Sequence, residues 1–297
     1  MNERTVVALA AHAMATRFEL VLHGEDQCHL RAAGEGALEE IIGLEAQLSP
    51  YRPESELSWI NAHAAHEPVK AEPRLFRLLQ LAKVLNAETD GAFDVTIAPL
   101  MRAWGFSRDK GKVPTADQLE AARHAVGMDH VLLNENNSTV KFDREGTTLD
   151  LGAIGKGYAI ECAVESLREN QVTSALLHGG TSAVYAIGTP PNASAWRVAL
   201  RNPAEQDREL RPIDLCDSSL SVSAVHGKSF VEGGRTYGHV IDPRTGESCV
   251  AAPLAAVTGP SPTKCDALST ALLVLGDAWL PTLAERFPGY QGLLMGA

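Results

Sequence analysis

The spacing of apolar residues along the chain predicts helices interleaved with short strands. Helical spacing predicts helices over residues 30–47, 72–90, 117–125, 156–169 and 265–276. Alternating or continuous apolar runs predict strands over residues 14–23, 130–133, 139–142, 148–151, 174–178, 183–187, 197–201, 219–224, 238–241 and 291–295. Because these elements do not follow a regular βαβ order, the pattern indicates an α+β fold with mixed or antiparallel sheets.

Composition narrows the class of protein. The 297 residues are 45% hydrophobic and 21% charged, which is typical of a globular protein, and no repeat or low-complexity segment interrupts them. A net charge of −11 argues against a general nucleic-acid binder, since phosphate neutralisation needs clustered basic residues. No apolar stretch approaches the roughly 20 residues of a transmembrane helix.

Compartment is read from the cysteines and the first residues. Five cysteines without CxxC spacing argue against a disulfide framework and predict a reducing, cytoplasmic compartment. Residues 6–15 weakly resemble a signal peptide, but the segment before them has no net side-chain charge and His12 interrupts the apolar run. Export to the periplasm is the alternative, if the chain is a trimmed form.

A glycine-rich segment from Leu149 to Ala159 combines Asp150 and Lys156 with three glycines, between a strand-like and a helix-like run. Glycines allow close backbone approach to an anion, and the start of the following helix and the lysine add positive potential. The spacing fits neither a Walker loop nor a dinucleotide fingerprint. A strand-to-helix turn without a ligand therefore stays open beside a phosphate site.

Asp266 and Thr270 are four residues apart in a predicted helix, so their oxygens share one face. Both are hard oxygen donors suited to Mg²⁺, which commonly takes few protein ligands and completes its shell with phosphate and water. The alternative is structural: Asp266 caps the helix and Thr270 bonds its own backbone.

The segment from His239 to Gly246 places a histidine and an aspartate around a Pro/Gly turn. His239 can serve as a general base and Arg244 can hold an anion. A strand histidine beside a turn that Asp242 stabilises explains the same residues. Tyr51, followed by Arg52 and Pro53, offers an aromatic face and a cation, or only packing.

Eight such pieces occur in an order that resembles the ApbE family, the FAD:protein FMN transferases, from Met14 to about Leu294. The pieces are Met14–Phe18, Tyr51–Ser58, Gly91–Asp94, Trp104–Phe106, Leu149–Ala159, Gly179–Gly180, His239–Gly246 and Asp266–Ala271.

The resemblance implies a single catalytic domain over residues 1–297, with a two-lobed, T-fold-related architecture that holds FAD in the cleft between the lobes. It implies that Mg²⁺ is bound by Asp266, Thr270 and the backbone carbonyl of Ala153, and that His239 is the base. It implies that the flavin nucleotide is lined by Met14, Tyr51, Ala92, Phe93, Asp94, Asp150, Lys156 and Ile241. The implied reaction transfers FMN to a threonine or serine hydroxyl of an acceptor flavoprotein, with release of AMP.

Two departures from the family pattern concern the nucleotide site. Thr181 and Ser182 follow Gly179-Gly180 where the family usually has Asp, and Val222–Val225 replaces Thr-Ser-Gly-Asp. We expect the neighbouring His178 and His226 to be structural or incidental. An FAD pyrophosphatase that releases FMN and AMP, and a flavin-binding or trafficking protein with impaired catalysis, are the alternative functions.

Overall fold

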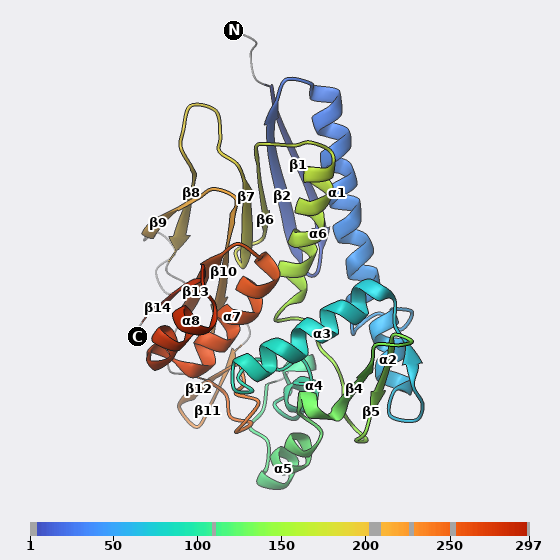
Figure 1. The fold of residues 1–297 in the computed structure, drawn as a ribbon. Helices are drawn as coiled ribbons and strands as arrows, with labels where there is room; N and C mark the ends of the chain where they lie inside the picture. Colours follow the sequence, from blue (N-terminus) through green and yellow to red (C-terminus); the bar gives the residue numbers. More distant parts are fainter. Residues whose placement is uncertain (1–4, 109–110, 202–208, 226–228, 250–253, 296–297) are drawn as a thin grey trace.

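The structure, a computed structural model, describes residues 5–108, 111–201, 209–225, 229–249 and 254–295. Within these residues, seven strands form one antiparallel sheet with the order β1-β2-β6-β7-β10-β13-β14 (Figure 1). The strands are β1 (Thr5–Ala13), β2 (Thr16–Gly24), β6 (Ala175–Gly179), β7 (Ala183–Ile187), β10 (Ser218–Ala224), β13 (Leu254–Gly259) and β14 (Gln291–Met295). The α+β class with mixed or antiparallel sheets, predicted from the apolar pattern, is confirmed, and the large sheet is the antiparallel kind.

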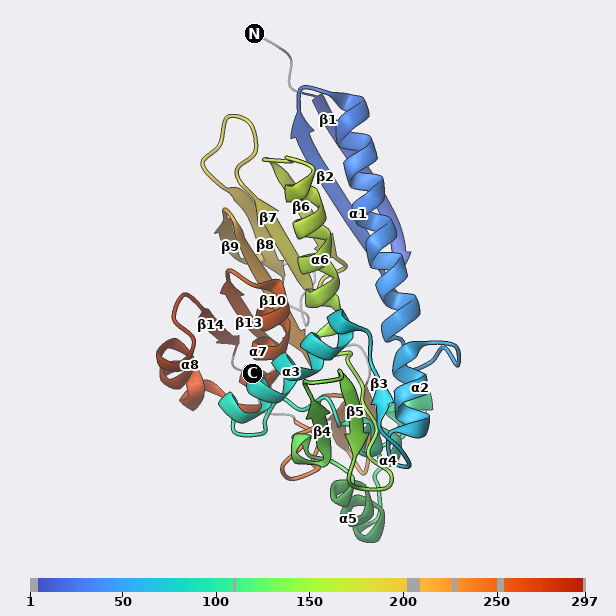
Figure 2. The ribbon, with the colours of Figure 1, turned by 45° about the vertical axis from the view of Figure 1, so that its right-hand side comes forward.

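Three helices cover one face of this sheet (Figures 1 and 2). They are α1 (Gln27–Leu48), α6 (Gly155–Glu169) and α7 (Pro262–Leu275), and α6 lies between the other two in contact with both. Their buried apolar stripes join the inward side chains of β1, β2 and β6 in the main core. Burying such stripes supplies most of the stability of helices in a domain.

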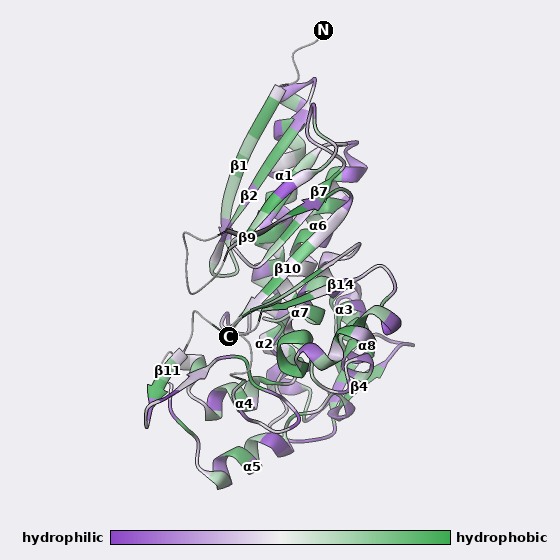
Figure 3. Cartoon of the chain, turned by 90° about the vertical axis from the view of Figure 1, so that its left-hand side faces the viewer, coloured by the Kyte–Doolittle hydropathy of each residue, from purple (hydrophilic) through white to green (hydrophobic). Residues whose placement is uncertain are grey.

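A hairpin of β8 (Trp196–Arg201) and β9 (Glu209–Leu215) covers part of the opposite face. Trp196 and Leu215 pack there against Val184, Leu220 and Leu254 in a second core. Figure 3 shows hydrophobic colouring along most of β1 and β2, the strands at the edge of the large sheet. The large sheet is thus buried on one face and partly covered on the other.

The remaining elements, apart from the last helix, which packs on β14, lie in the lower part of Figure 2. A small sheet has the order β3-β5-β4, and β11 pairs with β12. The bounds are α2 (Glu56–His63), β3 (Val69–Lys70), α3 (Pro73–Glu88), α4 (Ala98–Ala103), α5 (Ala116–His124), β4 (Val131–Asn134), β5 (Thr139–Phe142), β11 (Ser229–Glu232), β12 (Arg235–Gly238) and α8 (Leu280–Arg286), with short 3-10 turns at Phe106–Arg108, Met128–His130 and Asp277–Trp279.

Side-chain caps explain where several helices begin. Asp26 accepts bonds from the backbone at the start of α1, Ser55 caps α2, and Ser261 caps α7. Thr115 and Gln118 form a reciprocal capping box at the start of α5. These residues satisfy first-turn N–H groups that have no partner within the helix.

The structure confirms the five predicted helices with shifts of a few residues, but it differs elsewhere. Most of the 6–15 segment, which weakly resembles a signal peptide, belongs to the edge strand β1 (Thr5–Ala13), which pairs with β2 along its whole length. The predicted strands 148–151 and 238–241 are wrong: the first is extended chain outside any sheet, and the second contains only the end of β12 and one isolated bridge at Ile241. Leu149, Leu151 and Val240 of these runs are buried in the main core, which produces the apolar pattern without a sheet ladder.

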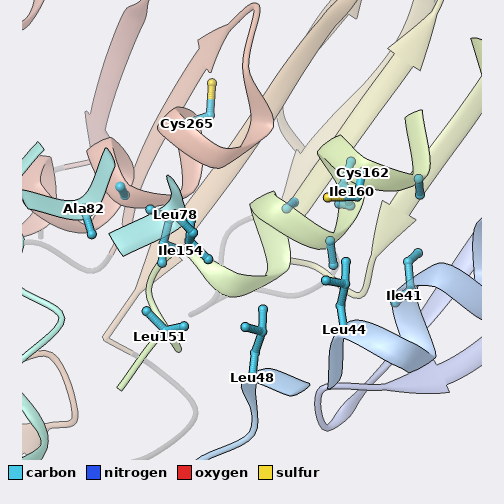
Figure 4. Close-up of a cluster of buried hydrophobic side chains, with 14 of the residues drawn as sticks. Ile41, Leu44, Leu48, Leu78, Ala82, Leu151, Ile154, Ile160, Cys162 and Cys265 are labelled. Carbon is cyan, nitrogen blue, oxygen red and sulfur yellow. The ribbon is translucent and has the colours of Figure 1, made fainter. Parts of the chain in front are cut away.

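The helices α6 and α7 touch at Gly157. A Cβ placed on Gly157 would lie 2.7 Å from the Cβ of Asp266 and would collide with the carbonyl oxygen of Pro262. Gly157 has no left-handed φ, so close packing rather than a turn requires the glycine. Figure 4 shows the apolar cluster beside this contact, where Leu151 and Ile154 meet side chains of α1 and α3.

No described helix is both long enough and apolar enough to cross a membrane.

We expect Gly157→Ala to lower the free energy of unfolding by about 1–3 kcal/mol, the usual cost of forcing a methyl group into a packed contact. Gly36→Ala is the matched control, because Gly36 lies in the exposed part of α1 and an added Cβ meets nothing within 4 Å. That control should gain about 0.5–1 kcal/mol from helix propensity. Urea unfolding measures both, and equal effects would contradict the packing role of Gly157.

Candidate active site

The glycine-rich segment is held as extended chain by a side chain from α2. The amide nitrogen of Asn61 donates to the Leu149 carbonyl at 2.9 Å, and the Leu149 N–H donates to the Asn61 side-chain oxygen at 2.8 Å. The next residue, Asp150, donates its N–H to the carbonyl of Val95 at 2.7 Å. Asn61 therefore replaces a neighbouring strand, which explains why this run resembles a strand in sequence.

Charged groups surround the turn that follows. The Asp150 carboxylate accepts the Gly152 N–H at 2.8 Å, and the Lys156 ammonium reaches the Gly152 carbonyl at 3.4 Å. Helix α6 begins at Gly155 without a side-chain cap from its own Ile154. A helix start and a lysine therefore meet at one turn, which is an anion-binding arrangement.

Asp266 of α7 lies against this helix start. Its side chain is 3% exposed, and its carboxylate accepts the Gly157 N–H at 2.9 Å. Burial raises the pKa of Asp266, while the charge of Lys156 and the backbone N–H groups of Gly157 and Lys156 oppose that rise. The structure thus brings Asp266 to the first turn of the helix that Ala153 precedes.

Thr270 lies one turn beyond Asp266 and is fixed by β10. Its hydroxyl is 3.0 Å from the Ser223 hydroxyl and 3.4 Å from the Asp266 carbonyl, and Ser269 approaches Ser223 at 2.8 Å. Ser223 and Ser269 were not predicted as site residues. Ser223 stands in the Val222–Val225 segment, where it is the one residue that matches the family's Thr-Ser-Gly-Asp, so the residue that holds Thr270 is kept while its neighbours differ.

Hydrogen bonds link the two segments that differ from the family pattern, Thr181–Ser182 and Val222–Val225, to the region of the β1–β2 turn. The Val222 N–H donates to the Ser182 carbonyl at 2.7 Å, and the Gly180 N–H donates to the Arg17 carbonyl at 2.9 Å. Met14 and Ala15 form the turn with φ of 51° and 56°. Two non-glycine residues in the left-handed region are uncommon and strained there.

A hollow of about 480 Å³ lies beside that turn, and its lining includes Ala15 and Glu45. Glu45 also pairs with Arg52 at 3.1 Å, next to Tyr51. Tyr51 is 71% exposed, so its ring presents a face to a ligand or to solvent. The Met14 and Tyr51 turns therefore flank the same glutamate.

The Gly91–Asp94 loop, whose residues 92–94 the resemblance places along the flavin nucleotide, is largely buried. Phe93 is 1% exposed in the main core, so its ring packs inside the molecule. The Asp94 carboxylate accepts both the N–H and the hydroxyl of Thr96, at 2.7 and 2.6 Å, and the amide of Asn86 at 3.1 Å. Burial raises the pKa of Asp94 and these bonds oppose the rise. Ala92 is also buried, at 2%.

The His239–Gly246 turn is organised by an ion pair. Arg244 donates twice to the Asp242 carboxylate, at 2.9 and 2.8 Å. Burial alone would raise the pKa of Asp242, but the bonds from Arg244 outweigh it and lower that pKa. Arg244 thus serves the turn through Asp242, as the structural interpretation expected, and the indole of Trp104 donates to the Gly246 carbonyl at 2.8 Å.

His239 directly follows Gly238, whose backbone packs closely on Val225 at the end of β10. Ile241 is 4% exposed in a third core with Trp104. His239 is thereby placed next to the strand that carries Ser223. His178 pairs with Glu19 at 3.3 Å on the sheet, and His226 lies outside the described residues.

Arg102 of α4 is a further cation that the sequence did not reveal. Its guanidinium donates to the Thr148 hydroxyl at 3.1 Å, and its interaction with Asp150 partly offsets the desolvation that lowers the pKa of Arg102. The four residues between Pro99 and Trp104 contain this arginine, but nothing in their spacing indicates a site.

The donor set at Asp266 suits a hard divalent cation. One buried carboxylate, the Thr270 hydroxyl and a nearby backbone turn provide oxygen ligands, and phosphate and water complete such shells around Mg²⁺. Across the described ranges, no group of three or more His, Cys, Asp or Glu side chains could hold a metal.

Comparisons with known proteins agree with this arrangement. The model of the ApbE family matches residues 14–294. A Treponema pallidum protein named FAD:protein FMN transferase is 31% identical over 278 residues, 87% of this chain and 76% of that protein. A Vibrio cholerae protein of the same name is 30% identical over 243 residues, 80% of this chain and 72% of that protein.

Solved structures give the same result. The ApbE protein of Thermotoga maritima has a TM-score of 0.90 with 27% identity, over 99% of this chain and 96% of that one. The flavinyl transferase ApbE of Pseudomonas stutzeri, in its apo form, has a TM-score of 0.85 with 26% identity, over 98% and 95%.

We expect Asn61→Ala to lower the free energy of unfolding by about 1–3 kcal/mol, because it leaves the N–H and carbonyl of buried Leu149 without partners. Asn136→Ala, at an exposed turn, should change it by less than about 0.5 kcal/mol. Urea unfolding compares the two, and equal losses would contradict the bracing role of Asn61.

Thiol reactivity tests the burial of Cys249, next to the His239–Gly246 turn, and of Cys162 on α6. Burial raises the pKa of Cys249 to about 12, with the charge of Asp242 adding to the effect, and burial raises the pKa of Cys162 to about 11. Since the thiolate is the reactive form, iodoacetamide at pH 8 should modify exposed Cys28 and Cys216 at least about 100-fold faster than these two. Peptide mass spectrometry measures each rate, and rapid modification of native Cys249 would overturn the placement.

Proposed function

Because the chain belongs to the ApbE family and is an FAD:protein FMN transferase, we propose that it esterifies FMN to a threonine or serine hydroxyl of an acceptor protein, with Mg²⁺ bound and AMP released. The activity of an FAD:protein FMN transferase follows from the relatives. The metal, the bond formed and the leaving group are the proposal.

One observation supports the proposal above the others: the buried Asp266 carboxylate lies on the start of α6, beside Lys156 and one turn from Thr270. A buried carboxylate with incomplete compensation favours a cation, and the adjacent helix start and lysine favour an anion. A diphosphate with its magnesium ion supplies both charges.

The proposed ligands of Mg²⁺ are Asp266, Thr270 and the Ala153 carbonyl. When bound, Mg²⁺ would offset the negative charge of the diphosphate and of the departing phosphate. Lys156 and the positive dipole end of α6 would orient the diphosphate, and Arg102 would add positive potential near Asp150. Met14 and Tyr51 would meet the flavin ring, while Ile241 and the backbone of Ala92, Phe93 and Asp94 would border the nucleotide.

His239 would take the proton from the acceptor hydroxyl as its oxygen attacks the phosphorus of the FMN half. A bond forms between that oxygen and phosphorus, and the bond from phosphorus to the bridging oxygen breaks. The electron pair leaves with AMP, and FMN remains joined to the acceptor by a phosphoester. Water in place of the hydroxyl would give free FMN and AMP.

The test incubates the full chain with FAD, Mg²⁺ and a threonine-containing acceptor peptide, and follows flavin by mass spectrometry. FMN covalently bound to the peptide supports the proposal. Free FMN with AMP would indicate a pyrophosphatase, and bound but unchanged FAD would indicate a binding protein; either result alone would overturn transfer.

We expect His239→Ala to lower the transfer rate by at least about 100-fold, the usual contribution of a general base, while FAD binding changes by less than about twofold. His29→Ala is the control, because His29 bonds the Asn170 carbonyl at the far start of α1. Single-turnover rates and flavin fluorescence separate the two quantities. Unchanged transfer by His239→Ala would refute the assignment of the base.

A further inference from the structure

Helices α6 and α7 cap each other. The Asp266 carboxylate of α7 accepts the N–H of Gly157 in the first turn of α6. In return, the Glu161 carboxylate of α6 accepts the Ser261 hydroxyl at 2.8 Å, the Thr263 N–H at 3.1 Å and the Thr263 hydroxyl. First-turn groups of each helix are therefore satisfied by an acid of the other.

The two capping contacts lie beside the close packing of the helices at Gly157. Gly157 and Glu161 are four residues apart on α6, and Pro262 and Asp266 are four apart on α7, so each pair lies on one helix face. Gly157 packs against both Pro262 and Asp266. Hydrogen bonds at two points, one turn apart along α6, limit both sliding and rotation of α7.

Glu161 is the stronger of the two braces. One of its oxygens accepts three hydrogen bonds, whereas the Asp266 carboxylate accepts the backbone N–H groups of Gly157 and Lys156 and would also hold the cation. Ser261 already caps its own helix through the Lys264 N–H at 3.2 Å, so Glu161 also fixes the capping hydroxyl. Asp266 lies one turn after these anchored residues along α7.

We infer that Glu161 is a positioning residue for the cation site: it anchors the first turn of α7 so that Asp266 faces the turn that contains Ala153. The inference rests on the proposed function, because the cation is part of it. Glu161 itself touches neither the substrate nor the ion.

The experiment titrates the full chain with Mn²⁺, an ion that suits oxygen ligands, in the presence of FAD, and follows free Mn²⁺ by electron paramagnetic resonance. Glu161→Ala should weaken Mn²⁺ binding at least about tenfold, the usual effect of losing a group that orients a metal ligand. Glu161→Gln keeps an acceptor oxygen and should recover most of the affinity.

Glu165→Gln is the matched control. Glu165 is exposed one turn further along α6, and it makes no hydrogen bond to α7 among the described residues. It should bind Mn²⁺ within about twofold of the wild type. Urea unfolding and protection of buried Cys265 from alkylation show whether α7 remains folded. If Glu161→Ala does not fold, Thr263→Val removes one donor to Glu161 and should weaken Mn²⁺ binding in the same direction.

Wild-type affinity for Mn²⁺ in folded Glu161→Ala would overturn the inference. If Thr263→Val is used in its place, wild-type affinity in that folded variant would overturn it too. The same loss of Mn²⁺ affinity in Glu165→Gln would also overturn it. FMN transfer by the wild type is measured separately. Transfer with unchanged Mn²⁺ affinity in the variants would retain the proposed function and reject Glu161. Absence of transfer with the expected differences in Mn²⁺ affinity would retain Glu161 and reject the proposed function.

Discussion

A buried carboxylate at the start of a helix is the interaction on which the rest of the site depends. Asp266 is 3% exposed, and a charge placed so deeply is costly unless it is paired and hydrogen-bonded. The first turn of α6 offers N–H groups and a positive dipole end, and Lys156 adds a full charge. Only a glycine at position 157 lets the two backbones come close enough for this contact.

The large sheet and its helices serve to hold that contact in place. The apolar stripes of α1, α6 and α7 share one core with the sheet, so α6 cannot shift without disturbing side chains on both neighbours. On the other side, Ser223 of β10 fixes the Thr270 hydroxyl. The site therefore lies where the sheet, two helices and the 149–153 turn meet, and each contributes one constraint.

The same arrangement explains how a chain with a net charge of −11 can bind a negatively charged dinucleotide. Local potential, rather than net charge, acts on a bound ligand within about one Debye length, roughly 8 Å at physiological salt. Lys156, Arg102 and the start of α6 gather positive potential at one turn. The negative net charge of the chain argues against binding of nucleic acids in general.

Local pattern alone determined five of the helices, the α+β class with mixed or antiparallel sheets, and the oxygen pair of Asp266 and Thr270, because periodicity and short spacing are properties of neighbouring residues. The order of eight short pieces along the chain determined the resemblance to the ApbE family. Tertiary structure decided that Asn61 braces Leu149 from 88 positions away, that Ser223 holds Thr270, and that Glu161 anchors α7. It also decided that the ring of Phe93 is core and that residues 5–13 are an edge strand. These outcomes depend on contacts between segments far apart along the chain, which no local pattern of apolar and polar residues encodes.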